Sequence, residues 1–324
     1  MSNKLKTLLA SAVAPMVFAA TPVVADDYPT RDITIIVAYS AGGGTDVMAR
    51  AMVPFMEEYL GGNVNITVEN RPGAGGEIGF TAIATAEPDG YTIGMLNSPA
   101  FLTPMIQRSP EYDLDSFQLI ANVVTDAASI VVREDSEFAT LDDFVDYARE
   151  NPHALTVGNS AIGGALHTSL LRFLAMEDGV EVTHVPFQGA APDRTALLGG
   201  HTAASVMGLG EAGEYHNEGS LRILGTMAPE RWSVVEDVPT FRELGYNIVS
   251  ASDRGMAAPA GIPDDVLAAL AEAVENTVND PEFQEVALNQ LLPLNYMGPE
   301  DYRAHIEETY ADMQRLWEAN PWAD

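Results

Sequence analysis

The 324-residue chain is strongly acidic, because 47 Asp and Glu residues outnumber 16 Lys and Arg residues and give a formal net charge of −31 at pH 7. So acidic a chain is a poor partner for nucleic acid or for an anionic membrane, since both are bound through basic side chains. The absence of cysteine excludes disulfides, thiolate metal ligands and cysteine nucleophiles. The length predicts two domains, and the acid excess predicts solubility at high salt and a salt-tolerant source.

The N-terminus has the pattern of a secretory signal peptide. Lys4 and Lys6 form a short positive region, and the apolar residues 8–20 are too few to span a bilayer, which takes roughly 20. Small residues end this segment at Ala25, so we expect signal peptidase to remove residues 1–25. Loss of both lysines leaves 14 arginines against 47 acids, a net charge near −33. The exported protein is expected in the periplasm of a Gram-negative source.

Strands and helices alternate through the first part of the chain. Residues 33–39 (ITIIVAY) are predicted as a buried strand, and a glycine loop then opens a helix over 46–60. Further strands are expected at 64–69 and 91–96, separated by a glycine-rich turn and a helix that ends at Ala86. This order is typical of βαβ units.

The second part continues the alternation and then changes character. A helix is predicted over 164–176, among short strands at 130–133, 155–158, 180–186, 203–207 and 221–226. After Pro263 apolar residues recur at helical spacing, which predicts an almost wholly helical tail. The pattern as a whole favours an α/β protein.

Two glycine loops share one design, in which a buried strand ends and a helix begins. One spans residues 39–46 (YSAGGGTD) and the other spans residues 158–164 (GNSAIGG). Glycine lets the backbone approach a ligand closely, and the helix N-terminus offers unpaired N–H groups with about half a positive charge. Two such loops are predicted to hold a carboxylate without Arg or Lys, although each loop alone could be a plain turn.

Other ligand-binding and catalytic motifs are incomplete. The chain has no P-loop lysine, the dinucleotide fingerprint has Ile78 in place of its third glycine, and a nucleophile elbow would need glycine at Ile162. His167 is the one histidine close to a glycine loop, where helix packing is favoured over the role of a base. The sequence therefore predicts no metal, no cofactor and no catalytic residue.

Several strings in collinear order cover nearly the whole chain after the signal. The most specific is ENRPGAGG at 69–76. The others are YPTR at 28–31, GGGTD at 42–46, PDGY at 88–91, VPFQG at 185–189 and APAG at 258–261. With these strings the chain resembles the Bug-type receptors, which are the substrate-binding components of tripartite tricarboxylate transporters.

The resemblance implies a two-lobed α/β fold of the periplasmic-binding-protein (Venus flytrap) type, class II-like, with strands that cross between the lobes. It implies that residues 27–124 and 248–324 form lobe one and that residues 125–247 form lobe two. The helical C-terminal tail is expected to pack on lobe one.

The resemblance also implies which residues hold the ligand between the lobes. Asp46 is expected to cap N–H groups of its own loop, and Ile162 departs from the family by standing where a hydroxyl residue is frequent. Ser98 and Gln188 are expected near the far end of the ligand. The full expected set is Tyr39, Ala41, Gly42, Gly43, Gly44, Thr45 and Asp46 in the first loop, Ser160, Ala161, Ile162, Gly163 and Gly164 in the second, and Ser98 and Gln188.

The function implied is capture of a small carboxylate by a monomeric, non-enzymatic binding protein. The closed form would deliver this ligand to the small and large transmembrane subunits of a transporter. Two alternatives stay open at this point: a periplasmic sensor that feeds a two-component system, and an exported hydrolase. The hydrolase would need a nucleophile and a base in the cleft.

Overall fold

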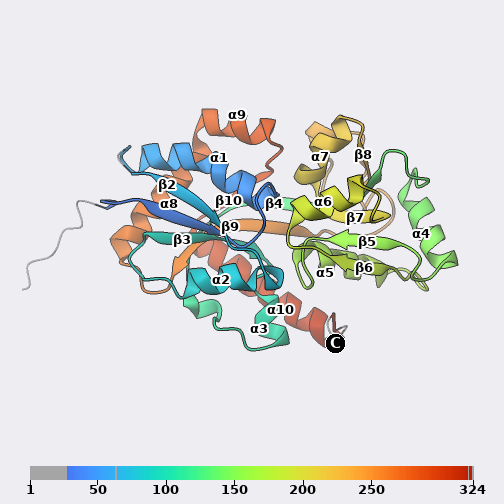
Figure 1. Cartoon of the computed structure of the whole chain (residues 1–324), viewed down its shortest axis with the longest axis horizontal. Coiled ribbons are helices and arrows are strands. Elements are labelled where there is room, and N and C mark those ends of the chain that lie inside the picture. Colours follow the sequence, from blue (N-terminus) through green and yellow to red (C-terminus); the bar gives the residue numbers. More distant parts are fainter. Residues whose placement is uncertain (1–27, 63, 320, 323–324) are drawn as a thin grey trace, which may run out of the picture.

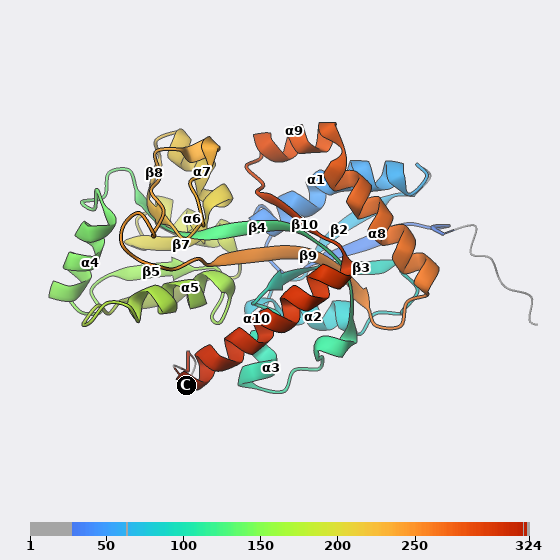
Figure 2. The same ribbon diagram turned by 180° about the vertical axis from the view of Figure 1, so that it is seen from behind.

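The computed structural model describes residues 28–62, 64–319 and 321–322 of the chain. The predicted signal peptide, residues 1–25, lies outside the described residues. The chain forms two α/β lobes side by side, joined by one long strand that runs through both and by a second strand that pairs with it (Figures 1 and 2). The two-lobed α/β fold predicted from the sequence is confirmed.

Lobe one is a sheet with helices on both faces. Its strands lie in the order β2-β1-β3-β9-β4, with β10 paired to the far side of β4. Strands β1, β2 and β3 are parallel, as expected for βαβ units. The elements of the N-terminal part are β1 (Ile33–Val37), α1 (Gly44–Tyr59), β2 (Ile66–Asn70), α2 (Glu77–Ala84), β3 (Thr92–Ser98) and α3 (Thr103–Gln107). The C-terminal part adds α8 (Asp264–Asn279), α9 (Pro281–Asn289), β10 (Leu294–Met297) and α10 (Pro299–Ala319).

Lobe two repeats the arrangement with the parallel strands β6, β5 and β7. Strand β4 joins this sheet by pairing antiparallel with β7. Thr140 caps α4 by accepting a hydrogen bond from the backbone N–H of Asp143, which fixes where this helix starts. The elements of the lobe are α4 (Leu141–Glu150), β5 (Thr156–Asn159), α5 (Ala165–Leu174), β6 (Thr183–Pro186), α6 (Ala190–Leu198), β7 (Ala204–Gly208), α7 (Leu209–Asn217) and β8 (Leu221–Thr226).

Two strands cross between the lobes, β4 (Phe117–Arg133) and β9 (Ala251–Pro259). They pair antiparallel with each other, and β4 continues into lobe two, where it pairs with β7 and β8. The sequence predicted a strand at 130–133 alone, so most of the 17-residue β4 was missed. The expected lobe boundaries remain a prediction, and the one at residue 124 falls inside β4 because that strand belongs to both sheets.

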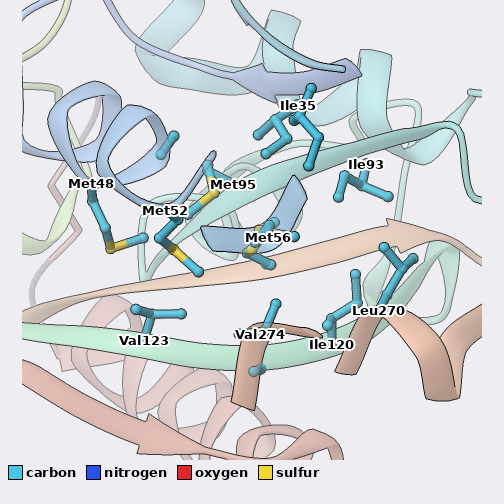
Figure 3. Packing of buried hydrophobic residues seen from close by; sticks show 14 of the residues in the cluster. Ile35, Met48, Met52, Met56, Ile93, Met95, Ile120, Val123, Leu270 and Val274 are labelled. Atoms are coloured by element: carbon cyan, nitrogen blue, oxygen red, sulfur yellow. The ribbon is translucent and has the colours of Figure 1, made fainter. Parts of the chain in front are cut away.

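The core of lobe one is divided by its sheet, because successive side chains of a strand point to opposite faces. Ile33, Ile35 and Val37 of β1 belong to one cluster, whereas Ile36 belongs to another with Phe80. Figure 3 shows the first cluster, in which methionines of α1 meet strand side chains and the inner face of α8. The residues labelled there are Ile35, Met48, Met52, Met56, Ile93, Met95, Ile120, Val123, Leu270 and Val274.

The C-terminal tail packs on lobe one, as expected, and its end also reaches lobe two. Tyr302 and Ile306 of α10 are buried in the second cluster of lobe one. A Cβ added to Gly163 of lobe two would lie 2.8 Å from Trp322 Nε1, so the two segments are in contact. The tail is not wholly helical, because β10 interrupts it. Across the described ranges no helix combines the length and apolarity that crossing a membrane requires.

Candidate functional site

The two lobes close on a cavity of about 30 Å³. A space of this size holds about one or two water molecules, so the lobes must part before an organic ligand can enter. Side chains and backbone of both lobes form its wall. The lining residues are Tyr39, Gly43, Gly44, Thr45, Asp46, Asn97 and Ala100, then Ser160, Gly164, Ala165, Leu166, Gly189, Ala190 and Glu211, and Ser252 and Arg254 of β9.

The first glycine loop brings the N-terminus of α1 to this cavity. Gly43 is the N-cap residue in extended conformation and, as a glycine, has no side chain of its own to cap the helix start. Asp46 Oδ2 accepts the N–H of Gly42 at 2.9 Å, and Asp46 Oδ1 accepts from Arg50 and from Asn70. Burial alone would raise the pKa of Asp46, but these hydrogen bonds hold it below its usual value. Asp46 therefore shapes the loop, as predicted from the sequence. Gly44, the first residue of α1, lies in the wall of the cavity.

The floor of the first loop is polar and buried. Asn97 of β3 donates from Nδ2 to Thr45 Oγ1 at 2.8 Å. The buried Oδ1 of Asn97 has no hydrogen-bond partner among the residues that the structure describes. Burial raises the pKa of Tyr39 well above its ordinary value, so its hydroxyl stays protonated and is a potential donor in the cleft. These groups give the cavity both donors and an acceptor.

The second glycine loop brings the N-terminus of α5 to the same cavity through Gly164 and Ala165. His167 Nδ1 accepts the N–H of Gly163 at 3.1 Å, and the His167 ring packs edge-on against His184 at 4.9 Å between centroids. Burial, together with the second histidine, lowers the pKa of His167 to about 4. A neutral His167 thus holds the loop as an acceptor, which is the packing role that the sequence favoured.

Asp193 of α6 lies beneath the strand that leads into this loop. Its Oδ1 accepts from Ser205 Oγ at 2.7 Å, whereas its buried Oδ2 has no partner among the described residues. A side chain at Gly158 would overlap this carboxyl group, so the loop strand and Asp193 are packed in direct contact. Burial raises the pKa of Asp193 to about 7.

Replacing Asp193 with asparagine is expected to stabilise the protein at pH 8. In the wild type the folded state keeps the proton up to about pH 7 while the unfolded chain loses it near pH 4, so stability falls as pH rises through this window. The asparagine variant should lose that slope and be more stable at pH 8 by about 2–4 kcal/mol, with little difference at pH 4.5. Urea unfolding at both pH values measures this. Asp178→Asn, at an exposed site of the same lobe, is the control, and an unchanged slope in Asp193→Asn would contradict the assignment.

Direct contacts hold the lobes together around the cavity. Ser40 donates from its N–H and from Oγ to the carbonyl of Gln188, at 3.3 and 2.9 Å. The N–H of Gly44 donates to Glu211 Oε1 at 3.0 Å, so a side chain from α7 of lobe two reaches the start of α1 in lobe one. The second contact places a carboxylate at a helix N-terminus, where the helix dipole favours negative charge.

A buried guanidinium completes the wall. Arg254 of β9 donates from Nη2 to Glu211 Oε1 at 2.6 Å and to Asp126 Oδ2 at 3.1 Å, and its side chain is 4% exposed. Burial raises the pKa of Asp126 to about 6, while Arg254 opposes that rise. Asp126 also accepts the N–H of Gly210 at 2.9 Å. Arg254 therefore lies between the carboxylates of Asp126 and Glu211, where the crossing strands meet lobe two.

The structure brings together part of the residue set predicted from the sequence. Those that line the cavity are Tyr39, Gly43, Gly44, Thr45, Asp46, Ser160 and Gly164. Gln188, Ala161 and Ile162 line a separate groove at the interlobe boundary, Gly42 borders another, and Ser98 is buried at the end of β3. Ala41 is exposed on the first loop, and Gly163 faces Trp322 instead of the cavity.

Sequence reasoning missed the charged part of the wall. Glu211 and Arg254 line the cavity together with Asn97 and Ser252, and none of these four residues was predicted from the sequence. The site predicted from the glycine loops needed no Arg, whereas Arg254 stands in the wall. A signal was available, because Arg254 directly precedes the apolar run GMAAP of β9, and a charge carried into a buried strand requires a partner.

Comparison with known proteins agrees with this architecture. Residues 48–320 match the family model described as the tripartite tricarboxylate transporter family receptor. A protein of Cupriavidus necator, "UPF0065 protein in gbd 5'region", is 32% identical over 303 residues, which cover 93% of this chain and 91% of that protein.

Solved structures show the same fold. The periplasmic binding protein BugD superposes with a TM-score of 0.84 at 28% identity, covering 90% of this chain and 98% of that one. MatC of Rhodopseudomonas palustris, solved with bound malate, gives 0.81 at 26% identity over 89% and 99%. A second R. palustris protein, solved with adipate, gives 0.83 at 26% identity over 90% and 98%. The resemblance to Bug-type receptors is confirmed: this chain belongs to the tripartite tricarboxylate transporter receptor family.

Proposed function

We propose that the chain is a periplasmic, non-enzymatic receptor that captures a small carboxylate between its lobes and delivers it as a monomer to the two transmembrane subunits of a tripartite transporter. The observation that carries this proposal is that the N-termini of α1 and α5 line one interlobe cavity. Both present backbone N–H groups and the positive ends of helix dipoles, which bind carboxylates. The malate and adipate bound to two related proteins are ligands of this class.

The magnitudes are sufficient for such a site. Four or five charge-assisted hydrogen bonds at roughly 1.5–3 kcal/mol each supply about 6–15 kcal/mol, and the upper part of this range covers both the ~8 kcal/mol net that micromolar binding requires and the costs of association and closure. The acidic surface repels anions at long range, but donors at about 3 Å act well inside the screening length of about 8 Å at physiological salt. Short-range geometry therefore outweighs net charge.

A thermal-shift screen of the protein without residues 1–25 tests the function. The panel contains malate, adipate and other small carboxylates, neutral sugars, and amines without a carboxylate. A ligand present at 100 times its Kd stabilises the folded state by about 2.7 kcal/mol, which raises the melting temperature by several degrees. We expect shifts with carboxylates only. Shifts with sugars alone, or none across the panel, would contradict the proposed function.

A further inference from the structure

Glu211 already occupies the part of the cleft where an anion is best stabilised. Its Oε1 accepts hydrogen bonds from the N–H of Gly44, at 3.0 Å, and from Arg254 Nη2, at 2.6 Å. A Cβ at position 44 would overlap both Glu211 Oε1 and the Arg254 guanidinium, so glycine is required for this close approach. A carboxylate oxygen thus bridges a helix N-terminus and a guanidinium, and the Glu211 side chain is 8% exposed.

We propose that Glu211 occupies the place of the ligand's carboxylate in the closed cleft, and that an incoming carboxylate displaces it and pairs with Arg254. This inference rests on the proposed carboxylate function. It assigns Arg254 as the charged partner of the ligand. It assigns Glu211 as a built-in competitor that lowers the affinity for every carboxylate ligand, because each must displace the Glu211 side chain. It also explains the small cavity, because the Glu211 side chain fills space that a ligand would need.

The present arrangement leaves buried polar groups without hydrogen-bond partners, which lowers the free energy needed to displace the Glu211 side chain. Glu211 Oε2 and Arg254 Nε are both buried, and neither has a hydrogen-bond partner among the residues described. Two carboxylates, those of Glu211 and Asp126, share the single guanidinium of Arg254. A buried polar atom without a partner is destabilising, because it has lost its hydrogen bonds to water. A ligand carboxylate able to meet both the helix N–H groups and Arg254 can recover part of this loss.

A displaced Glu211 has a place to go. A second cavity of about 180 Å³ lies on the other side of Glu211, Gly44 and Arg254, which line both spaces. Arg194 also lines the second cavity, where its guanidinium stands over the Tyr215 ring at 4.8 Å and donates a long 3.4 Å hydrogen bond to the carbonyl of Gly42. In the proposed displacement Glu211 rotates into this second cavity, which Glu214 also lines, and pairs with Arg194 while the ligand's carboxylate takes its former position.

Titration calorimetry with malate and adipate on Glu211→Gln tests the proposal. The glutamine keeps the shape and the acceptor oxygen but loses the charge, so it competes less well for Gly44 and Arg254. We expect carboxylates to bind about tenfold more tightly than to the wild type, the worth of one charge-assisted hydrogen bond. Glu218→Gln removes the same charge from the exposed C-cap position of α7 and should leave the affinity unchanged.

Arg194 supplies a second, independent readout. Arg194→Gln removes the alternative partner of Glu211 and changes no residue that lines the first cavity, although it also removes the long hydrogen bond to Gly42, so it should weaken carboxylate binding about threefold to tenfold in the wild-type background. In the Glu211→Gln background the same change should have little effect, because no carboxylate remains to be relocated. This non-additivity separates a relocation of Glu211 from a general loss of surface charge.

The measurements distinguish the competitor role of Glu211 from the carboxylate function itself. Tighter binding in Glu211→Gln together with the non-additive Arg194 effect supports the competitor role. If the wild type binds a carboxylate and Glu211→Gln binds it with the same or a lower affinity, the competitor role is overturned and the carboxylate function stays in place. If neither protein binds any carboxylate of the panel while both melt cooperatively, the proposed function itself is overturned.

Discussion

Gly43→Val is expected to abolish carboxylate binding while the protein still folds. Gly43 has φ −86° and ψ 165°, an extended conformation that suits a β-branched residue. An added Cβ would lie 3.7 Å from the N of Ala190 and from the carbonyl O of Ser40, which is ordinary contact. The two valine methyl groups, however, extend into the space between these atoms of opposite lobes. They would hold the lobes apart and cover the start of α1.

The expected effect is an increase in Kd of at least about 100-fold, equivalent to about 2.7 kcal/mol, with the melting temperature within a few degrees of the wild type. Calorimetry on the ligand found by thermal shift measures the first quantity, and circular dichroism measures the second. Gly298→Val is the matched control, because an added Cβ there meets nothing closer than Tyr296 Oη at 3.7 Å, away from the cleft. An unchanged Kd in a folded Gly43→Val protein would remove the first loop from the proposed site.

Local patterns predicted those parts of the fold whose burial follows from adjacent residues. The apolar run of β1 indicates a strand that is buried on both faces, and the four-residue spacing of Val266, Leu270 and Val274 in α8 indicates one helix face packed on the core. Strand β4 was mostly missed because it carries polar residues that look unsuited to a buried strand. Their partners come from distant segments: Asn122 Nδ2 donates to the carbonyl of Asn295, and Asp126 accepts from Arg254.

The candidate site divides in the same way. The glycine loops are local features, so their position between a strand and a helix could be predicted, and the fold then brings both to one cavity. Glu211 and Arg254 lie 43 positions apart, and Glu211 is 167 positions from Gly44. Nothing near any of the three in sequence indicates the other two. Contacts of this kind arise from lobe packing, which local periodicity does not encode.

Arg254→Met is expected to be the most destabilising single substitution of a charged residue in the cleft. It leaves Asp126 and Glu211 buried beside each other without the cation that both now contact. Removing one partner of a buried ion pair typically costs about 3–5 kcal/mol, because the remaining charge is uncompensated. Arg231→Met breaks an exposed pair with Glu243 and should cost about 1 kcal/mol or less.

The pH dependence identifies the cause of that loss. Burial already raises the pKa of Asp126 to about 6, and loss of Arg254 removes a group that lowers it, so the pKa should rise further in the variant. Since the folded state then holds a proton that the unfolded chain releases near pH 4, the variant should regain stability as pH falls from 8 towards 5. Urea unfolding of Arg254→Met at pH 8 and pH 5 measures this recovery. Adding Asp126→Asn and Glu211→Gln should restore most of the lost stability at pH 8. A loss that persists at pH 5 and in the triple variant would mean that Arg254 acts by packing its side chain and not by compensating buried charge.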